Sequence, residues 1–316
     1  MLTPANGDAS AHSHPRLMRH RLPATEHLIT LVTIARVGSF TKAAQELDVT
    51  QSALSRHIMT LQRQLGIKLF ERVGRHARLT PAGAELCARA QPILDELART
   101  TEALTAASGA VGGRVRLGAS ESVAVNSLPA ILRSYLQHHG RVQVRLTCRT
   151  SEQLPELVRE GSIDVAVCPL DSPPKPEEGL AALRLWEEEI VLVLPISHPG
   201  RSRSLASYLN EDFIMVLRGT ETRRTIERAL AEQGHQLRVV LEHESTEVIK
   251  AMVMAGLGLS LLPEPNVRRE ARRGELAVLP LSDLRVTRTI YAIHDARRQL
   301  WPAEQALLEA LQRYRR

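Results

Sequence analysis

The apolar positions near the start of the chain recur at helical spacing, in segments separated by turn residues. The first segment has one apolar face, formed by Leu28, Leu31, Val32 and Ala35. Gly38 ends this helix, and Ser39 can cap a second, short helix over about 41–47. The small residues Ala43 and Ala44 inside that helix allow another helix to approach closely. The pattern therefore predicts two closely packed helices.

A third helix, expected over 51–65, has an apolar and a polar face. Its apolar stripe is formed by Leu54, Ile58, Leu61 and Leu65, and Thr50 can cap its start. Its polar face opens with Gln51, Ser52, Ser55 and Arg56. A helix in the major groove of DNA presents its N-terminal residues to base edges, where Gln suits adenine and Arg suits guanine. Each residue alone also fits a solvated face. Here, however, the third helix follows a helix and a turn, which is the order of a helix-turn-helix. These four residues, together with the hydroxyls of Thr41 and Thr50, are therefore the candidate DNA-binding residues.

After Gly66 the pattern changes from helical spacing to alternation. Residues 67–70 are expected to form a strand, and 71–79 a tight glycine-centred turn between two short strands. Arg72 and Arg75 in this wing suit phosphate and minor-groove contacts, whereas Arg78 fits a solvated hairpin tip. Seven basic residues stand against three acidic ones from position 42 to 78. Segment 25–80 is therefore predicted as a winged helix-turn-helix DNA-binding domain, rich in α-helix.

A long helix is expected next, over about 81–108. Thr80 can cap it, Pro81 suits its first position, and Pro92 should kink it. Its apolar positions approximate a coiled-coil seam made by Leu86, Ala90, Ile93, Leu97, Thr101 and Leu104. A solitary exposed helix of this length would leave that seam in water. We therefore expect this linker helix to form a homodimer.

From residue 113 onward, strands alternate with helices. Strands are expected over 114–118, 142–148 and 163–168, with a helix over 150–160. A second series follows, over 190–194, 213–216, 220–233, 238–242, 246–255 and 259–262. A final strand and helix, over 287–293 and 301–314, should return to the first series. This alternation predicts a doubly wound, two-lobed α/β domain over 113–316.

The first lobe is expected to take about 113–169 and 285–316, and the second lobe about 170–284. The chain should cross between them near 168–174 and 281–286. In open α/β sheets, ligands bind where strands end and helices begin. The candidate effector-binding residues in those loops are Ser120, Ser122, Thr150, Arg218, Thr220, Thr222 and Thr246. Hydroxyl groups at such positions often serve only as helix caps. Arg149 and Arg218 lie next to two of these loops, which suggests an anionic ligand such as a carboxylate.

Composition narrows the function classes. The net charge of +6 is mild support for a polyanionic partner, and 3% aromatic residues argue against a platform for single-stranded nucleic acid. No apolar run reaches about 18 residues, and three cysteines without CxxC spacing fit a reduced, cytoplasmic protein. Segment 1–24 is polar, lacks a secretory core and is expected to be a disordered arm, and Met18 is an alternative start. An unordered arm makes His12, His14 and His20 poor metal ligands.

Catalytic signatures are absent from the sequence. It contains no HExxH and no GxSxG, and GLGLSLLPE at 256–264 lacks the third glycine of a dinucleotide-binding loop. That segment is expected to be a tight turn into a buried strand. The run Glu187, Glu188 and Glu189 is expected to be a solvated cluster. We therefore expect no enzyme activity, cofactor or metal site.

The segment GSFTKAAQELDVTQSALSRHIMTLQRQLGIKLFER, followed by GRHARLTPAG, resembles the N-terminal domain of LysR-type transcriptional regulators. The resemblance extends over nearly the whole chain from Leu28. It departs from the family at Leu31, often Phe, and at Gln62, often Glu; both changes suit packing and neither lies on the reading face. The resemblance implies a winged helix-turn-helix, a linker helix and a two-lobed effector domain like a periplasmic binding protein.

By the same resemblance, Gln51, Ser52, Ser55 and Arg56 match positions that face DNA, and Arg72 and Arg75 match the wing. The loops of Ser120 and Thr220 match effector contacts. Family members bind promoter DNA at interrupted palindromes, respond to a small-molecule co-inducer and commonly form homotetramers. RNA polymerase is a further candidate partner. The alternatives are a solute-binding module with a vestigial helix-turn-helix, which would show no salt-dependent DNA affinity, and an α/β enzyme.

Overall fold

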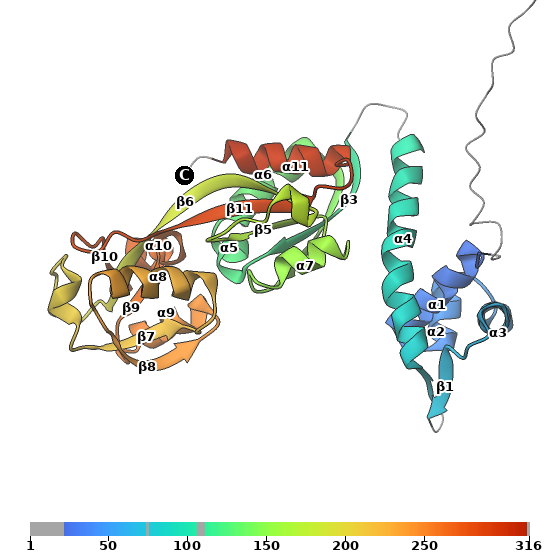
Figure 1. The fold of residues 1–316 in the computed structure, drawn as a ribbon, viewed down its shortest axis with the longest axis horizontal. Helices are drawn as coiled ribbons and strands as arrows, with labels where there is room; N and C mark the ends of the chain where they lie inside the picture. The colour runs from blue at the N-terminus through green and yellow to red at the C-terminus, as the bar shows by residue number, and fades with distance from the viewer. Residues whose placement is uncertain (1–21, 74–75, 106–110, 315–316) are drawn as a thin grey trace, which may run out of the picture. The chain divides into compact units, whose positions relative to one another are not determined.

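The computed structural model describes residues 22–73, 76–105 and 111–314 (Figure 1). The chain divides into two compact units, residues 1–101 and 102–316. Most of the predicted disordered arm, and Arg75 of the predicted wing, lie outside the described residues.

Three helices form the core of the first unit: α1 (Thr25–Val37), α2 (Phe40–Glu46) and α3 (Gln51–Leu65). Their apolar faces meet in one core, formed by Leu31, Ile34, Ala43, Ala44, Leu54, Ile58, Leu61 and Leu69. The predicted caps are confirmed: Ser39 Oγ accepts from Lys42 N at 3.4 Å, and Thr50 Oγ1 accepts from Ala53 N at 3.2 Å. Leu65 is the exception to the predicted stripe, because it is partly exposed at the helix end.

The wing is a short antiparallel hairpin, β1 (Phe70–Val73) and β2 (His76–Leu79). The predicted strand over 67–70 was wrong, because pairing starts only at Phe70. Leu69 instead belongs to the helical core, and its N–H donates to Gln62 Oε1 at 2.7 Å. Phe70 N–H donates to the same oxygen at 3.3 Å. Gln62 therefore fixes the point where the chain turns from α3 into the wing.

Helix α4 (Pro81–Thr105) follows the wing and contains Pro92. Thr80 caps it as predicted, since its Oγ1 accepts from Gly83 N at 3.1 Å. The predicted seam divides into two parts. Leu86 packs against the core of the first unit and Ala90 is buried, whereas Ile93 and Leu97 are 65% and 50% exposed. Thr101 is also exposed, and the side chain of Leu104 lies outside the described part.

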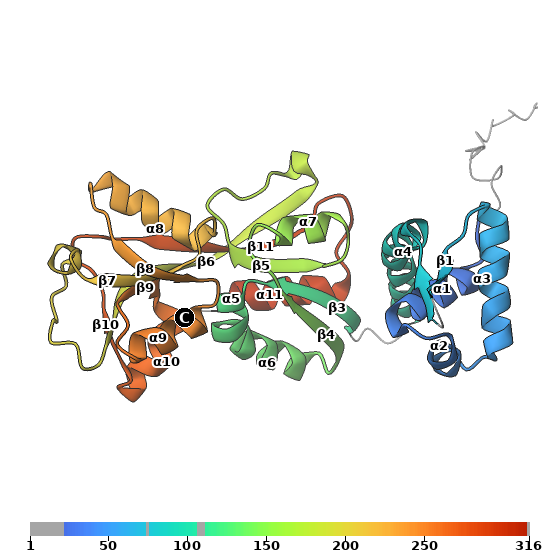
Figure 2. The ribbon, with the colours of Figure 1, turned by 90° about the horizontal axis from the view of Figure 1, so that it is seen from below.

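The second unit has two lobes, and a mixed β-sheet runs through both of them. In the first lobe, β3 (Gly112–Ala119) lies parallel to β4 (Arg141–Cys148) and β5 (Val165–Pro169). Strand β11 (Thr287–Asp295) then pairs antiparallel with β5 and with β6 (Leu180–Pro195). The lobe also holds α5 (Glu121–Asn126), α6 (Leu128–His138), α7 (Leu154–Arg159) and α11 (Pro302–Arg313). Helices α6 and α11 cover one face of this sheet and α7 the other (Figure 2).

The second lobe is built on the C-terminal part of β6. That part pairs with β9 (Ser260–Pro263) and β10 (Leu276–Leu279), while β7 (Asp212–Val216) and β8 (Arg238–His243) form a parallel pair. Helix α8 (Glu221–Glu232) packs in one core, and α9 (Thr246–Met254) and α10 (Glu264–Arg273) pack in another. Short 3-10 turns lie at Pro176–Glu178 and Leu205–Tyr208. The glycine turn at 256–258 leads into the fully buried β9, as predicted.

One of the two predicted crossings between the lobes lies elsewhere. Residues 180–189 of β6 pair with β11 in the first lobe, and Ile190 onward pairs with β9 in the second (Figure 1). The chain therefore crosses inside one continuous strand, not near 168–174. At the other predicted crossing, Val286 O accepts from Ile190 N at 2.9 Å, so the two connections lie side by side.

Candidate DNA-reading face and effector cavity

The N-terminal part of α3 carries the predicted DNA-binding residues on its outer face. Gln51, Ser52 and Arg56 are exposed and Ser55 is half-buried, while Leu54 and Ile58 between them are buried. Thr50 already serves the helix: besides its cap bond, its Oγ1 lies 3.0 Å from Ser52 Oγ. The set therefore projects from a helix whose start is fixed by its own side chains.

The remaining predicted DNA contacts come from other elements of the first unit. Thr41 is exposed in the first turn of α2. Arg72 lies in β1, opposite Ala77 in the hairpin. Arg75 lies outside the described residues.

A cavity of about 420 Å³ lies between the lobes of the second unit. It brings together six of the seven predicted effector-binding residues: Ser120, Ser122, Thr150, Thr220, Thr222 and Thr246. These come from the ends of strands in both lobes, as the sequence predicted from the loop positions. Arg149 also lines the cavity, and its Nη1 donates to Cys148 O at 2.7 Å.

Arg288 forms the charged centre of the cavity wall, and the sequence analysis did not identify it. Its side chain is nearly fully buried, and its Nε and Nη2 donate to Glu188 Oε2 at 2.9 and 2.6 Å. Nη1 donates to Thr222 Oγ1 at 2.7 Å, and Nη2 to Ser122 Oγ at 3.1 Å. Thr222 belongs to the second lobe and Ser122 to the first. One guanidinium therefore connects both lobes across the cavity.

The prediction that Glu187, Glu188 and Glu189 form a solvated cluster was wrong for Glu188. It is 2% exposed, whereas Glu187 and Glu189 on either side are exposed. All three lie in β6, where successive side chains point to opposite faces. The middle carboxylate therefore faces inward, where it meets Arg288.

Other cavity hydroxyls differ in whether they already have partners. Thr246 Oγ1 accepts from Asn266 Nδ2 at 3.4 Å, and Asn266 Oδ1 accepts from Asn126 Nδ2 of the first lobe at 3.1 Å. Ser245 Oγ donates to Glu121 Oε1 at 2.8 Å. Ser120 Oγ, by contrast, is buried with no hydrogen-bond partner in the described protein. Buried polar groups are normally paired, so Ser120 marks a place where a bound molecule could supply the partner.

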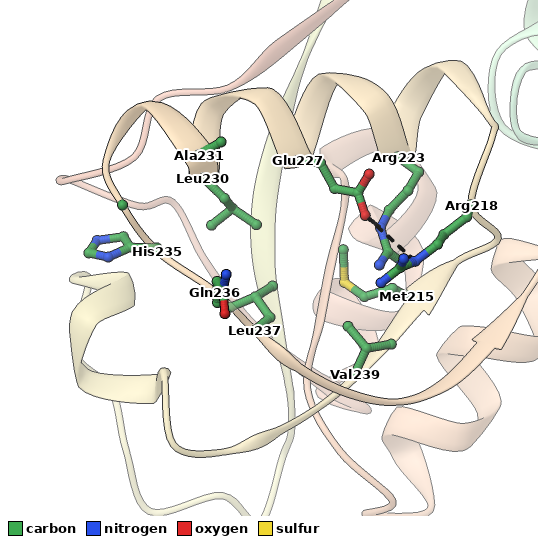
Figure 3. Close-up of a pocket in the computed structure, with 11 residues that line it drawn as sticks. Met215, Arg218, Arg223, Glu227, Leu230, Ala231, His235, Gln236, Leu237 and Val239 are labelled. Carbon is green, nitrogen blue, oxygen red and sulfur yellow. Dashed lines mark hydrogen bonds and ion pairs between the residues drawn. The ribbon is translucent and has the colours of Figure 1, made fainter.

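Arg218 lies outside this cavity, contrary to the prediction. It lines a separate pocket of about 550 Å³ between α8 and β8 (Figure 3). Its Nε lies 3.4 Å from Glu242 Oε1 and 4.0 Å from Glu227 Oε1. The buried Arg223 shares both carboxylates. Its position next to a cavity loop was an insufficient guide, because the Arg218 guanidinium extends toward Glu227 and Glu242 and not into the cavity.

The cavity lining also contains a cysteine, Cys148. Its side chain is exposed and lines the cavity, whereas Cys168 is buried and Cys87 partly buried. Burial raises the pKa of the Cys168 thiol to about 12, against a lowering by the Ser151 hydrogen bond. Burial also raises the pKa of Cys87.

We predict that Cys148 reacts first with a disulfide reagent such as DTNB at pH 8. Only the thiolate reacts, and a pKa near 12 leaves about one part in ten thousand of Cys168 as thiolate at that pH. Cys168 should react only after unfolding in urea. The Cys148→Ser variant serves as the control, since it should lose the fast phase alone. A fast phase that survives in this variant would contradict the assignment.

A winged helix-turn-helix with an exposed polar helix face, followed by a two-lobed domain with a polar cavity, is typical of the class of ligand-responsive DNA-binding regulators. Residues 25–84 match the family of bacterial regulatory helix-turn-helix proteins of the lysR type, and residues 108–316 match the LysR substrate binding domain. The chain belongs to the LysR family of transcriptional regulators. It is thus a regulator that binds DNA and responds to a small-molecule effector.

Similar proteins of assigned function are transcriptional regulators. The chain is 32% identical over 281 residues to a probable RuBisCO transcriptional regulator of Cyanophora paradoxa, covering 86% of each protein. It is 29% identical over 279 residues to the RuBisCO operon transcriptional regulator of Allochromatium vinosum, covering 87% of this chain and 91% of that one. Within the described residues, no helix has the length and apolar character needed to cross a membrane.

Solved structures share the fold over most of the chain. An OxyR C206 mutant from Corynebacterium glutamicum has a TM-score of 0.61 and 27% identity, with 93% of each chain covered. Full-length CbnR, complexed with its target DNA, has a TM-score of 0.71 and 24% identity, with 92% of this chain and 99% of that chain covered. These likenesses agree with the predicted winged helix-turn-helix and two-lobed α/β domain.

Proposed function

We propose that this regulator reads promoter DNA with the N-terminal residues of α3, and that a small molecule in the interlobe cavity controls that binding. The observation that carries the proposal is the polar start of α3, where Gln51, Ser52 and Arg56 are exposed above a complete core. A vestigial helix-turn-helix is not favoured, because the core and both helix caps are intact.

The proposed roles follow from side-chain chemistry. Gln51 has an amide donor and acceptor for base edges, and Arg56 has a fork of donors, while Ser52 and Ser55 allow the backbone to approach DNA. Thr41, Arg72 and Arg75 contact phosphates, which position the helix without reading sequence. Thr50 acts mainly as the cap that fixes Gln51 and Ser52.

Replacing Arg56 by alanine tests the reading face. We expect a loss of about 1–3 kcal/mol in binding free energy at the natural site, or roughly 5- to 150-fold in Kd, with specificity relaxed at one base pair. Footprinting and fluorescence anisotropy on the promoter beside the protein's own gene would measure both. Arg36→Ala is the matched control, because Arg36 is an exposed arginine of α1 that pairs with Glu46. Protection by the Arg56 variant equal to wild type would rule out the assigned face.

We further propose that the protein is a homodimer joined through α4, assembled into a tetramer. The support is the exposed pair Ile93 and Leu97, four residues apart on α4. Such a promoter-bound assembly works in the cytoplasm, where RNA polymerase is a candidate partner.

The double variant Ile93→Lys/Leu97→Lys should lower the mass measured by light scattering, because it places charges in the proposed interface. Ala88→Lys on the opposite side of α4 is the control and should leave the mass unchanged. If the double variant had the same mass as the wild-type protein, α4 would not be the dimer contact.

A further inference from the structure

The charge of the interlobe cavity differs from the one suggested by Arg149 and Arg218. Arg218 is absent from its lining, and four carboxylates face two guanidinium groups: Glu121, Glu152, Glu221, Glu244, Arg149 and Arg288. Acidic residues therefore exceed basic ones by two. A free anion entering this space would give up water and meet net repulsion.

Some of these charges are already paired within the protein. Arg288 is compensated by the buried Glu188. Arg224 Nη2 bridges two of the carboxylates, at 3.1 Å from Glu152 Oε1 and 2.5 Å from Glu221 Oε1. Arg224 thus offsets one of the two carboxylate charges on this side of the cavity.

Glu121 and Glu244 differ from the other two carboxylates. In the described chain neither forms an ion pair with a basic side chain, and Glu121 Oε1 only accepts the hydroxyl of Ser245 at 2.8 Å. Ser245 directly follows Glu244 in the chain, which brings the two acidic residues to the same part of the cavity wall. Glu121 belongs to the first lobe and Glu244 to the second.

Ser120 supplies a second, independent sign that this wall receives a molecule. The residue is 8% exposed, lines the cavity next to Glu121, and its Oγ lacks a hydrogen-bond partner. A hydroxyl can donate to or accept from a ligand.

We propose that the effector is a small polar molecule with a protonated amine and no net negative charge. Its ammonium group is held between Glu121 and Glu244, and a second polar group bonds Ser120. An ammonium has three donors, enough for both carboxylates. Contact with one glutamate from each lobe makes binding favour the arrangement in which the lobes are together. The inference rests on the proposed function, since it concerns the same cavity.

A thermal-shift screen of the full-length protein tests the chemical class. The amine set contains 1,4-diaminobutane and the proteinogenic amino acids other than aspartate and glutamate, which carry a net negative charge. The matched set replaces ammonium by hydroxyl, as in lactate for alanine and 1,4-butanediol for the diamine, and succinate and inorganic phosphate represent anions. We expect stabilisation by one or more amines and by none of their hydroxyl counterparts. The proposal would be overturned if no amine raised the melting temperature, or if an amine and its hydroxyl counterpart raised it equally. It would also be overturned if only the anions raised it.

Titration calorimetry with the best amine then tests the site. Glu244→Gln and Glu121→Gln should each raise its Kd about tenfold or more, because a charged hydrogen bond is lost. Glu121→Gln keeps an oxygen for Ser245 and so limits structural damage. Glu178→Gln, an exposed position outside the cavity, is the control. Unchanged Kd in both cavity variants would overturn the assignment.

Salt-dependent DNA binding without effector is measured in parallel. If DNA binding persists and the amines fail, only the effector class is wrong. If specific DNA binding is absent, the proposed function itself fails.

Discussion

Replacing Arg288 by methionine is expected to destabilise the second unit by about 3–5 kcal/mol. The substitution removes the guanidinium that bonds Glu188, Thr222 and Ser122, and leaves a carboxylate buried without its positive partner. Urea unfolding followed by tryptophan fluorescence would measure the loss. Both tryptophans of the chain, Trp186 and Trp301, belong to the second unit, so the signal reports on that unit.

The double variant Arg288→Met/Glu188→Leu separates charge from packing. Removing both ions together is often close to neutral for stability, because neither charge then remains buried alone. We therefore expect the double variant to recover most of the stability lost by Arg288→Met. If the two variants are equally unstable, charge compensation is not the main role of Arg288.

Gly83→Ala is expected to destabilise the first unit by about 1–3 kcal/mol and to weaken DNA binding with it. A Cβ at this position would lie 2.2 Å from Leu69 O and 3.0 Å from Leu79 Cδ2. The carbonyl cannot move freely, because it accepts Thr80 N–H at 3.0 Å. Calorimetry should show a lower transition for the first unit, while the tryptophan signal of the second unit stays unchanged.

Gly38→Ala provides the matched control for that experiment. Gly38 ends α1 with φ of 70°, but a Cβ there would meet nothing within 4 Å. Its cost is conformational only, about 1 kcal/mol. A Gly83 variant no less stable than this control would show that close helix packing does not depend on position 83.

Local patterns were sufficient for the three core helices of the first unit, although not for the start of its first strand. Helix α3 begins and ends where the sequence predicts, because its cap Thr50, its terminal Gly66 and its apolar stripe are all encoded within 17 residues. Much of the succession of strands and helices in the second unit also followed from local patterns. In each case the determining residues are neighbours in the chain.

The cavity was only partly predictable, because its central contact joins residues distant in sequence. Glu188 and Arg288 are separated by 100 positions, and neither lies in a loop that the strand-end rule selects. The strand containing Glu188 was predicted to begin at Ile190, so the two-residue alternation that buries it was overlooked. The direction of Arg218 depends on Glu227 and Glu242, and the loop position alone does not reveal that pairing.

The continuity of β6 has a consequence for how this chain can vary in length. Its residues pair with β11 before position 190 and with β9 after it. A single inserted residue would shift one of these registers and turn every following side chain to the opposite face. Such an insertion between Trp186 and Ile190 would move Glu188 away from Arg288 or expose the apolar run of β6. We therefore expect insertions to be tolerated in loops such as 171–175, but not in the strand that both lobes share.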